Sequence, residues 1–87
     1  MNGIEWLVNE LDRRKLLEAL DELDAEIIIA LADYNLNATE VAKRLYMHRN
    51  TVRYHIKRVH RLTGKDALNF YDLCELLPIA RQKCEID

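Results

Sequence analysis

The chain has 87 residues, 49% hydrophobic and 32% charged, which suits one globular domain and is too apolar for a disordered chain. A domain of this size buries only about 60 to 65% of its unfolded surface, so we expect an oligomer more readily than a monomer. Two Gly and one Pro provide almost none of the turns that a sheet of short strands requires. The composition therefore favours an all-α fold and argues against an all-β one.

Two further classes are disfavoured by the sequence. The longest apolar run, Ile27 to Ala32, is far shorter than the roughly 20 residues of a membrane span, and no secretory leader follows Met1. We therefore expect a cytoplasmic protein that does not contact the membrane. Cys74 and Cys84 lack CxxC spacing, which indicates reduced thiols rather than a disulfide framework or a zinc site.

The net charge of -2 conceals a strong segregation of charge along the chain. Residues 1–36 contain nine acidic and three basic side chains, and residues 66–87 contain five acidic and two basic ones. Residues 37–65 contain eight basic side chains against Glu40 alone, together with all three histidines. A basic segment inside an acidic protein predicts a polyanionic partner. The alternative interpretation is a solvated surface of unrelated basic residues.

The first half of the chain has helical periodicity. Apolar residues recur at three- and four-residue steps at Ile4, Leu7, Val8, Leu11, Leu16 and Leu20. This pattern predicts an amphipathic helix over about 3–20, whose apolar stripe either packs into the core or forms a dimer seam. The next period, from Leu23 to Tyr34, also predicts a helix. The run Ile27 to Ile29 is compatible with a short buried strand, but the sequence predicts no partner strand, which favours the helix.

The basic segment predicts a short helix and a longer one. Asn37 and Glu40 have capping-box spacing at the start of a helix over about 38–45. After a three-residue link, apolar positions at three- and four-residue steps predict a helix over about 49–62, which Gly64 is placed to stop.

One more helix is predicted near the C-terminus. Asn69 and Asp72 are spaced to cap a helix over about 70–82. Pro78 falls inside it, and because proline lacks the backbone donor and clashes with the preceding turn, we expect an end or a kink near Leu77. The whole chain, 1–87, is thus predicted to be a single small bundle of about four to five helices.

The segment over about 38–62 has the spacing of a helix-turn-helix, in which the second helix enters the major groove of DNA. Apolar or small side chains stand where that motif packs its two helices together: Val41, Ala42, Leu45, Met47, Val52 and Ile56. Ala42 falls at the close crossing, where only a small side chain fits. Tyr46 holds the link position at which many such motifs place Gly for a positive φ, which favours a turn that differs in detail.

The outward face of the second helix holds the candidate DNA-binding residues. Arg pairs bidentately with guanine and Asn with adenine, so the expected base-reading residues are Arg49, Asn50 and Arg53, with Tyr54 against a thymine methyl or a sugar. The expected phosphate contacts are Lys43, Arg44, His48, Thr51, Lys57, Arg58 and Arg61. We also expect His48 to cap this helix by accepting from the backbone N–H of Thr51, and His55 to face the groove or an interface.

The residues Ala38 to Leu45, His48 to Tyr54 and Leu62 to Gly64 resemble the C-terminal DNA-binding domain of PucR-type (purine catabolism regulator) transcription factors, and more distantly Fis-type domains. The resemblance covers about Asp24 to Gly64 and, more loosely, the last predicted helix. It implies a homodimeric regulator of transcription in a prokaryote that binds double-stranded DNA. It also implies DNA contacts by Arg49, Asn50, Thr51 and Arg53.

Other functions have little support in the sequence. No nucleophile and base pair, Gly-rich phosphate loop or metal-ligand set is apparent, so we expect neither an enzyme nor a cofactor or metal. The alternative function is a protein-interaction module in a transcription complex, which would dock through the acidic first helix and the segment Leu73 to Ala80. RNA is a third, weaker candidate partner. The outer face of 49–61 is too basic and polar for a protein-binding groove and suits phosphates.

Overall fold

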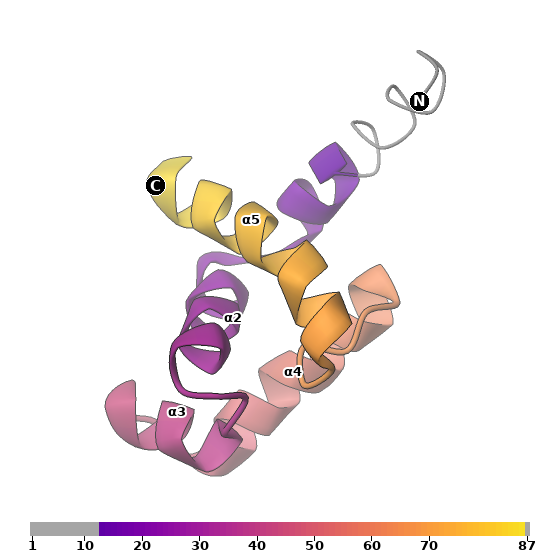
Figure 1. Ribbon diagram of the computed structural model, residues 1–87. Coiled ribbons are helices and arrows are strands. Elements are labelled where there is room, and N and C mark those ends of the chain that lie inside the picture. The colour runs from indigo at the N-terminus through magenta and orange to yellow at the C-terminus, as the bar shows by residue number, and fades with distance from the viewer. Residues whose placement is uncertain (1–12, 87) are drawn as a thin grey trace.

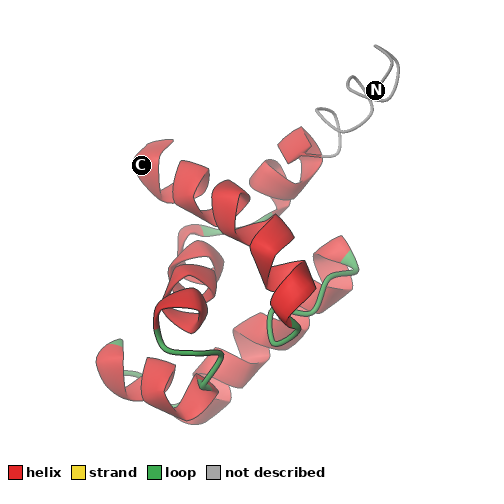
Figure 2. Ribbon diagram, in the orientation of Figure 1, coloured by secondary structure: helices red, strands yellow, loops and turns green. Residues whose placement is uncertain are grey.

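The computed structural model describes residues 13–86, and within them it contains only helices and loops (Figure 2). Helical residues 13–19 are followed by α2 (Glu22–Asp33), α3 (Ala38–Arg44), α4 (Arg49–Thr63) and α5 (Phe70–Ile86). The predicted all-α fold is therefore confirmed. Residues 27–29 lie within α2 and are helical, so the alternative strand does not form.

The described part of the first predicted helix packs inside the domain. Leu16 and Leu17 are partly buried against the core, and Leu20 is only 1% exposed. The Nη2 atom of Arg13 donates to Oε1 of Gln82 in α5 at 3.4 Å, which joins this segment to the last helix. Residues 3–12 of the prediction lie outside the described residues, so the proposed dimer seam stays a prediction.

The central element is α2, which contacts α3, α4 and α5 (Figure 1). Its buried side chains form the middle of the core: Ala25, Ile27, Ile28, Ala30 and Leu31. In contrast, α5 packs on α2 and makes no close backbone approach to α3 or α4. The pair formed by α3 and α4 is therefore held to the rest of the domain mainly through α2.

The predicted caps of the helices are largely confirmed. Asn37 begins α3, with its side chain accepting from the backbone N–H of Glu40 at 3.1 Å. Gly64 ends α4 in the left-handed conformation, with φ 75°. Oδ1 of Asn69 accepts from the backbone N–H of Asp72 at 3.1 Å, at the start of α5. The two Asn side chains each accept a backbone N–H that the helix itself leaves unpaired, and Gly64 adopts a positive φ that ends the helix.

Of the two alternatives expected near Leu77, the end of the helix is wrong, because α5 continues through Pro78 to Ile86, whereas the kink stays a prediction. Proline inside a helix costs about 3 kcal/mol, chiefly through its missing donor and its clash with the preceding turn. Because Pro78 has no backbone N–H, the carbonyl of Cys74 lacks its helical hydrogen bond. Both residues are exposed. Water can therefore reach that carbonyl, while burial of Leu76 and its neighbours Ile79 and Ala80 stabilises the helix on both sides of the proline.

Two further features complete the description. Cys74 is exposed and Cys84 is half-buried, and no disulfide joins them. Among the helices described, none has both the length and the apolar character needed to cross a membrane.

Candidate nucleic-acid interface

The helices α3 and α4 pack as a helix-turn-helix. Val41 and Val52 are fully buried, and Ala42 and Ile56 are 5% and 7% exposed. Leu45 and Met47, from the link, are partly buried against the same core. All six side chains that the motif requires to be apolar or small therefore face inward, as predicted, and they leave the opposite face of α4 to solvent.

The turn between the two helices is closed by backbone hydrogen bonds. The N–H of Tyr46 donates to the carbonyl of Lys43 at 3.3 Å, and the N–H of Met47 donates to the carbonyl of Ala42 at 2.9 Å. This pair of bonds defines a Schellman motif, in which the residue at the position of Tyr46 is left-handed and is usually Gly. The expectation that the turn differs in detail is wrong, because Tyr46 adopts φ 55° at a cost of about 1 kcal/mol.

His48 caps the N-terminus of α4, although its partner differs from the predicted one. Its Nδ1 atom accepts from the backbone N–H of Asn50 at 3.0 Å, whereas the N–H of Thr51 donates to the carbonyl of His48 at 2.9 Å. The His48 ring therefore accepts from the backbone N–H of Asn50 instead of the predicted N–H of Thr51. The ring remains on the surface beside the first turn of α4.

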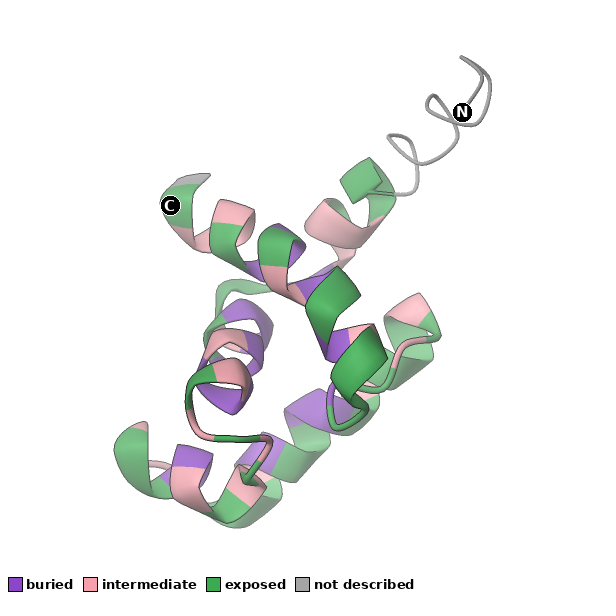
Figure 3. Ribbon diagram, in the orientation of Figure 1, coloured by how far each residue is buried: buried purple, intermediate pink, exposed green. Residues whose placement is uncertain are grey.

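The solvent face of α4 is basic and polar. No acidic residue occurs in Arg49–Thr63, and the buried residues of this helix lie on its other side (Figure 3). The helical period of 3.6 residues gathers the exposed side chains into one stripe: Arg49, Asn50, Arg53, Tyr54, Lys57, His60 and Arg61. The four residues predicted to read bases are thus brought together on one exposed face.

Other predicted phosphate contacts border this stripe. Lys43 and Arg44 are exposed in the last turn of α3, and Thr51 is half-buried at the edge of α4. Nε of Arg44 lies 3.0 Å from Oε1 of Glu40, and its guanidinium carbon lies 5.1 Å from the centre of the Tyr34 ring. An exposed ion pair of this kind is worth at most about 1 kcal/mol, so it leaves Arg44 available to a stronger anion.

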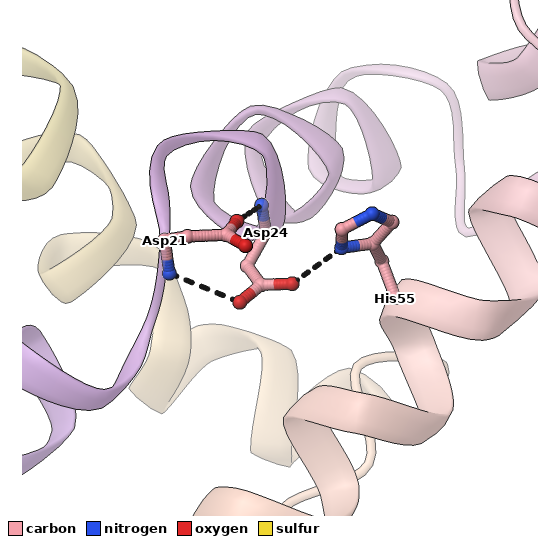
Figure 4. A group of neighbouring side chains, drawn as sticks. All are labelled: Asp21, Asp24 and His55. Atoms are coloured by element: carbon pink, nitrogen blue, oxygen red, sulfur yellow. Dashed lines mark hydrogen bonds and ion pairs between the residues drawn. The ribbon is translucent and has the colours of Figure 1, made fainter.

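Two residues of α4 turn toward α2 instead of toward solvent. His55 is 8% exposed, and its Nδ1 atom lies 2.6 Å from Oδ1 of the fully buried Asp24 (Figure 4). The guanidinium of Arg58 donates to the other oxygen of Asp24 and lies 3.6 Å from Oδ2 of Asp21. The predicted groove or interface position of His55 is therefore wrong. Arg58, predicted to contact phosphate, is engaged by two carboxylates.

Asp24 also helps to start its own helix. Its backbone N–H donates to Oδ1 of Asp21 at 2.7 Å, and its Oδ2 accepts from the backbone N–H of Asp21 at 3.0 Å, which forms a capping box (Figure 4). Ligand atoms of Asp21, Asp24 and His55 lie within 4.8 Å of one another. These atoms are already used in the cap and in the contacts to α4, and the Arg58 guanidinium already supplies a positive charge. We therefore assign the cluster a structural role.

Sequence reasoning missed this cluster because it joins residues 31 and 34 positions apart. One signal was present in the sequence. Asp24 lies four residues after Leu20 and three before Ile27, so it occupies a position on the apolar stripe of α2. A buried carboxylate requires a hydrogen-bonded or charged partner, and the basic segment predicted over about 49–62 is the part of the sequence richest in such partners.

We expect the substitution Asp24→Asn to lower the free energy of unfolding by about 3 kcal/mol, because it leaves the inward-facing Arg58 cation without its buried counter-charge. Urea unfolding followed by circular dichroism measures this loss. Asp33→Asn, an exposed carboxylate in the same helix, is the matched control and should change stability by less than about 0.5 kcal/mol. Equal losses in the two variants would contradict the structural role of Asp24.

Comparison with known proteins agrees with this geometry. The PucR C-terminal helix-turn-helix domain family matches residues 25–77, from α2 into α5. The carbohydrate diacid regulator of Escherichia coli (strain K12) is 35% identical over 71 residues, which cover 78% of this chain and 18% of that protein. The chain thus spans less than a fifth of the length of this relative. No solved structure gave a significant match.

The family match includes the whole helix-turn-helix and the helix on which it packs. It covers more than half of the chain and agrees with the extent of the resemblance seen in the sequence, which reached loosely into the last helix. The chain belongs to the family of PucR C-terminal helix-turn-helix domains.

Proposed function

We propose that this protein binds double-stranded DNA in a sequence-specific manner, with α4 in the major groove, and that it regulates transcription in a prokaryotic cytoplasm. The observation that carries the proposal is the solvent face of α4 within a helix-turn-helix: from Arg49 to Arg61 its exposed side chains are basic or polar, and the exposed apolar Leu62 lies in the last turn. In that motif the second helix lies in the major groove and the first crosses the DNA backbone. Membership of a family of regulators supports the same function.

The proposed base-reading residues are Arg49, Asn50, Arg53 and Tyr54. All four are exposed in the first two turns of α4, where a recognition helix meets base edges. An Arg guanidinium fits the two acceptors of guanine, and an Asn amide fits the acceptor and donor of adenine. These contacts would provide the discrimination between sequences.

The proposed phosphate contacts surround this stripe, and they comprise Lys43, Arg44, His48, Thr51, Lys57 and Arg61. Such contacts fix the register of the protein on the duplex and provide affinity that depends on salt. We leave Arg58 out of this set, because its guanidinium is paired with Asp24 and lies near Asp21. Releasing it to reach a phosphate would leave the buried carboxylate of Asp24 without its cation.

We also propose that the protein binds DNA as a homodimer. The first helix supplies the candidate seam, and a chain this short gains stability from a second copy. In a dimer with twofold symmetry, two recognition helices would enter successive major grooves about 34 Å apart.

The alternative function, a protein-interaction module, has less support from the structure. It required the segment Leu73 to Ala80 as a docking surface, but four of its apolar side chains, Leu73, Leu76, Ile79 and Ala80, are buried against the core, and Leu77 is half-buried. The exposed face of α4 likewise lacks the apolar centre that protein interfaces have.

The first test is a fluorescence-anisotropy titration with a random-sequence DNA duplex at several salt concentrations. We expect the double variant Arg53→Ala/Lys57→Ala to weaken binding and to reduce the steepness of log affinity against log salt by about 1, since the phosphate contact of Lys57 is lost and each such contact contributes about 0.9. Arg81→Ala/Lys83→Ala removes the same charge from α5 and is the matched control. If both variants bind alike, or the parent protein does not bind at low salt, the proposed interface is wrong.

The second test concerns sequence discrimination, with a site selected from a random DNA library. Arg49→Ala or Asn50→Ala should cost about 1 to 3 kcal/mol of binding free energy on the selected site and little on random DNA, because base contacts are lost. Arg61→Ala, the phosphate-contact control, should weaken binding to both duplexes by similar factors. Equal losses on both duplexes for Arg49 and Asn50 would reassign these residues to phosphates.

The third test concerns the homodimer. We expect the selected site to contain two inverted half-sites with centres about 10 base pairs apart, because the half-site spacing follows the twofold symmetry of the protein. Sedimentation of the complex with this duplex should then give two protein chains per duplex. A single half-site and one chain per duplex would exclude the dimer as the DNA-binding form.

A further inference from the structure

Tyr46, in the turn between α3 and α4, is the most unusual residue of the described surface. It adopts a left-handed backbone with φ 55°, a conformation that a bulky side chain rarely takes, and its side chain is 95% exposed. Within residues 13–86, its backbone N–H bonds to Lys43, but no side-chain hydrogen bond or ring contact involves Tyr46. The strained backbone therefore supports a ring that contributes no packing to the fold.

The other left-handed residues of the described chain have ordinary explanations. Asn35 has φ 56° at the equivalent position of the turn after α2, where the N–H of Leu36 donates to the carbonyl of Leu31 at 2.8 Å. Asn tolerates this conformation well. Leu36 has φ 63°, but its side chain packs against the core, and burial offsets the strain. Gly64 has no side chain to strain. Tyr46 alone among them has neither a tolerant side chain nor a buried one.

The surroundings of Tyr46 indicate what its ring would meet. Lys43 and Arg44 precede it in the last turn of α3, and His48 and Arg49 follow it at the start of α4. All four are exposed, and three of them are proposed phosphate contacts. Tyr46, with its exposed phenol, thus lies at the same end of the helix-turn-helix as the basic residues that would follow the DNA backbone.

We propose that Tyr46 contacts the DNA backbone, with its phenol O–H donating a hydrogen bond to a phosphate oxygen. This inference rests on the proposed function and adds to it a residue outside the recognition helix. Tyrosine is among the side chains that bond to phosphate oxygens, and such a contact positions the protein without reading sequence. The left-handed backbone of Tyr46 lowers the stability of the free protein, and the contact with DNA would offset this cost in the complex.

The test compares two variants with the parent protein. Tyr46→Phe removes only the hydroxyl and should weaken binding about 10-fold on the selected and random duplexes alike, the loss of one hydrogen bond to a charged group. The salt slope should stay unchanged because the phenol carries no charge. Tyr46→Asn should weaken binding at least as much and raise Tm by roughly 4 °C, because Asn relieves the left-handed strain.

Tyr71→Phe is the matched control. Tyr71 is also exposed, at 78%, but it lies in α5, which does not approach α3 or α4. This variant should bind both duplexes as the parent protein does, so any loss specific to Tyr46 reflects its position rather than the removal of a surface hydroxyl.

The possible failures are distinguishable. If the parent protein binds DNA and both Tyr46 variants bind within about twofold of it, the Tyr46 contact is wrong and the proposed function stands. A lower Tm for Tyr46→Asn would show that the ring supports the fold, which also overturns the inference. If the parent protein does not bind DNA at low salt, the proposed function fails and the Tyr46 contact fails with it.

Discussion

The arrangement of the domain depends on the buried carboxylate of Asp24. This group lies in the first turn of α2 and completes the cap of that helix, while it also binds His55 and Arg58 of α4. A carboxylate in the core is costly unless it is fully paired, and here every part of it has a partner. The two residues that it binds are three apart on α4, so they fix the rotation of that helix about its own axis as well as its distance from α2.

The rotation of α4 decides which side chains face solvent. With His55 and Arg58 directed to α2, and Val52, Ile56 and Val59 buried, the remaining positions form the basic stripe. The arginines of this one helix therefore have two different roles, although they lie only a few residues apart in the sequence. Arg58 neutralises a buried acid, whereas Arg53 and Arg61 remain on the surface with no ion-pair partner among the described residues.

The helices and the packing of the helix-turn-helix could be predicted because they depend on local patterns. Apolar spacing located α3 and α4 to within a residue or two, and Asn37 and Gly64 marked two of their ends. The errors came from tertiary contacts. Pro78 did not end α5 because the core holds both halves of that helix. The groove or interface position expected for His55 is wrong because its partner Asp24 lies more than 30 residues away, and the contact of Arg58 with the same carboxylate gave no local signal. The contacts with DNA remain predictions.

The opposed faces of α4 also bear on how such a domain can change over evolution. Positions 49, 50 and 53 are exposed, so their side chains can be exchanged at little cost to folding. If these residues read bases as proposed, such exchanges change the preferred DNA site. The side chains at positions 55 and 58 both bind the carboxylate at position 24, so the effect of a change at one of these positions on stability depends on the residues at the other two. Under the proposed function, the exposed face of α4 can therefore change its DNA site by single substitutions, while the contacts that hold α4 on α2 stay the same.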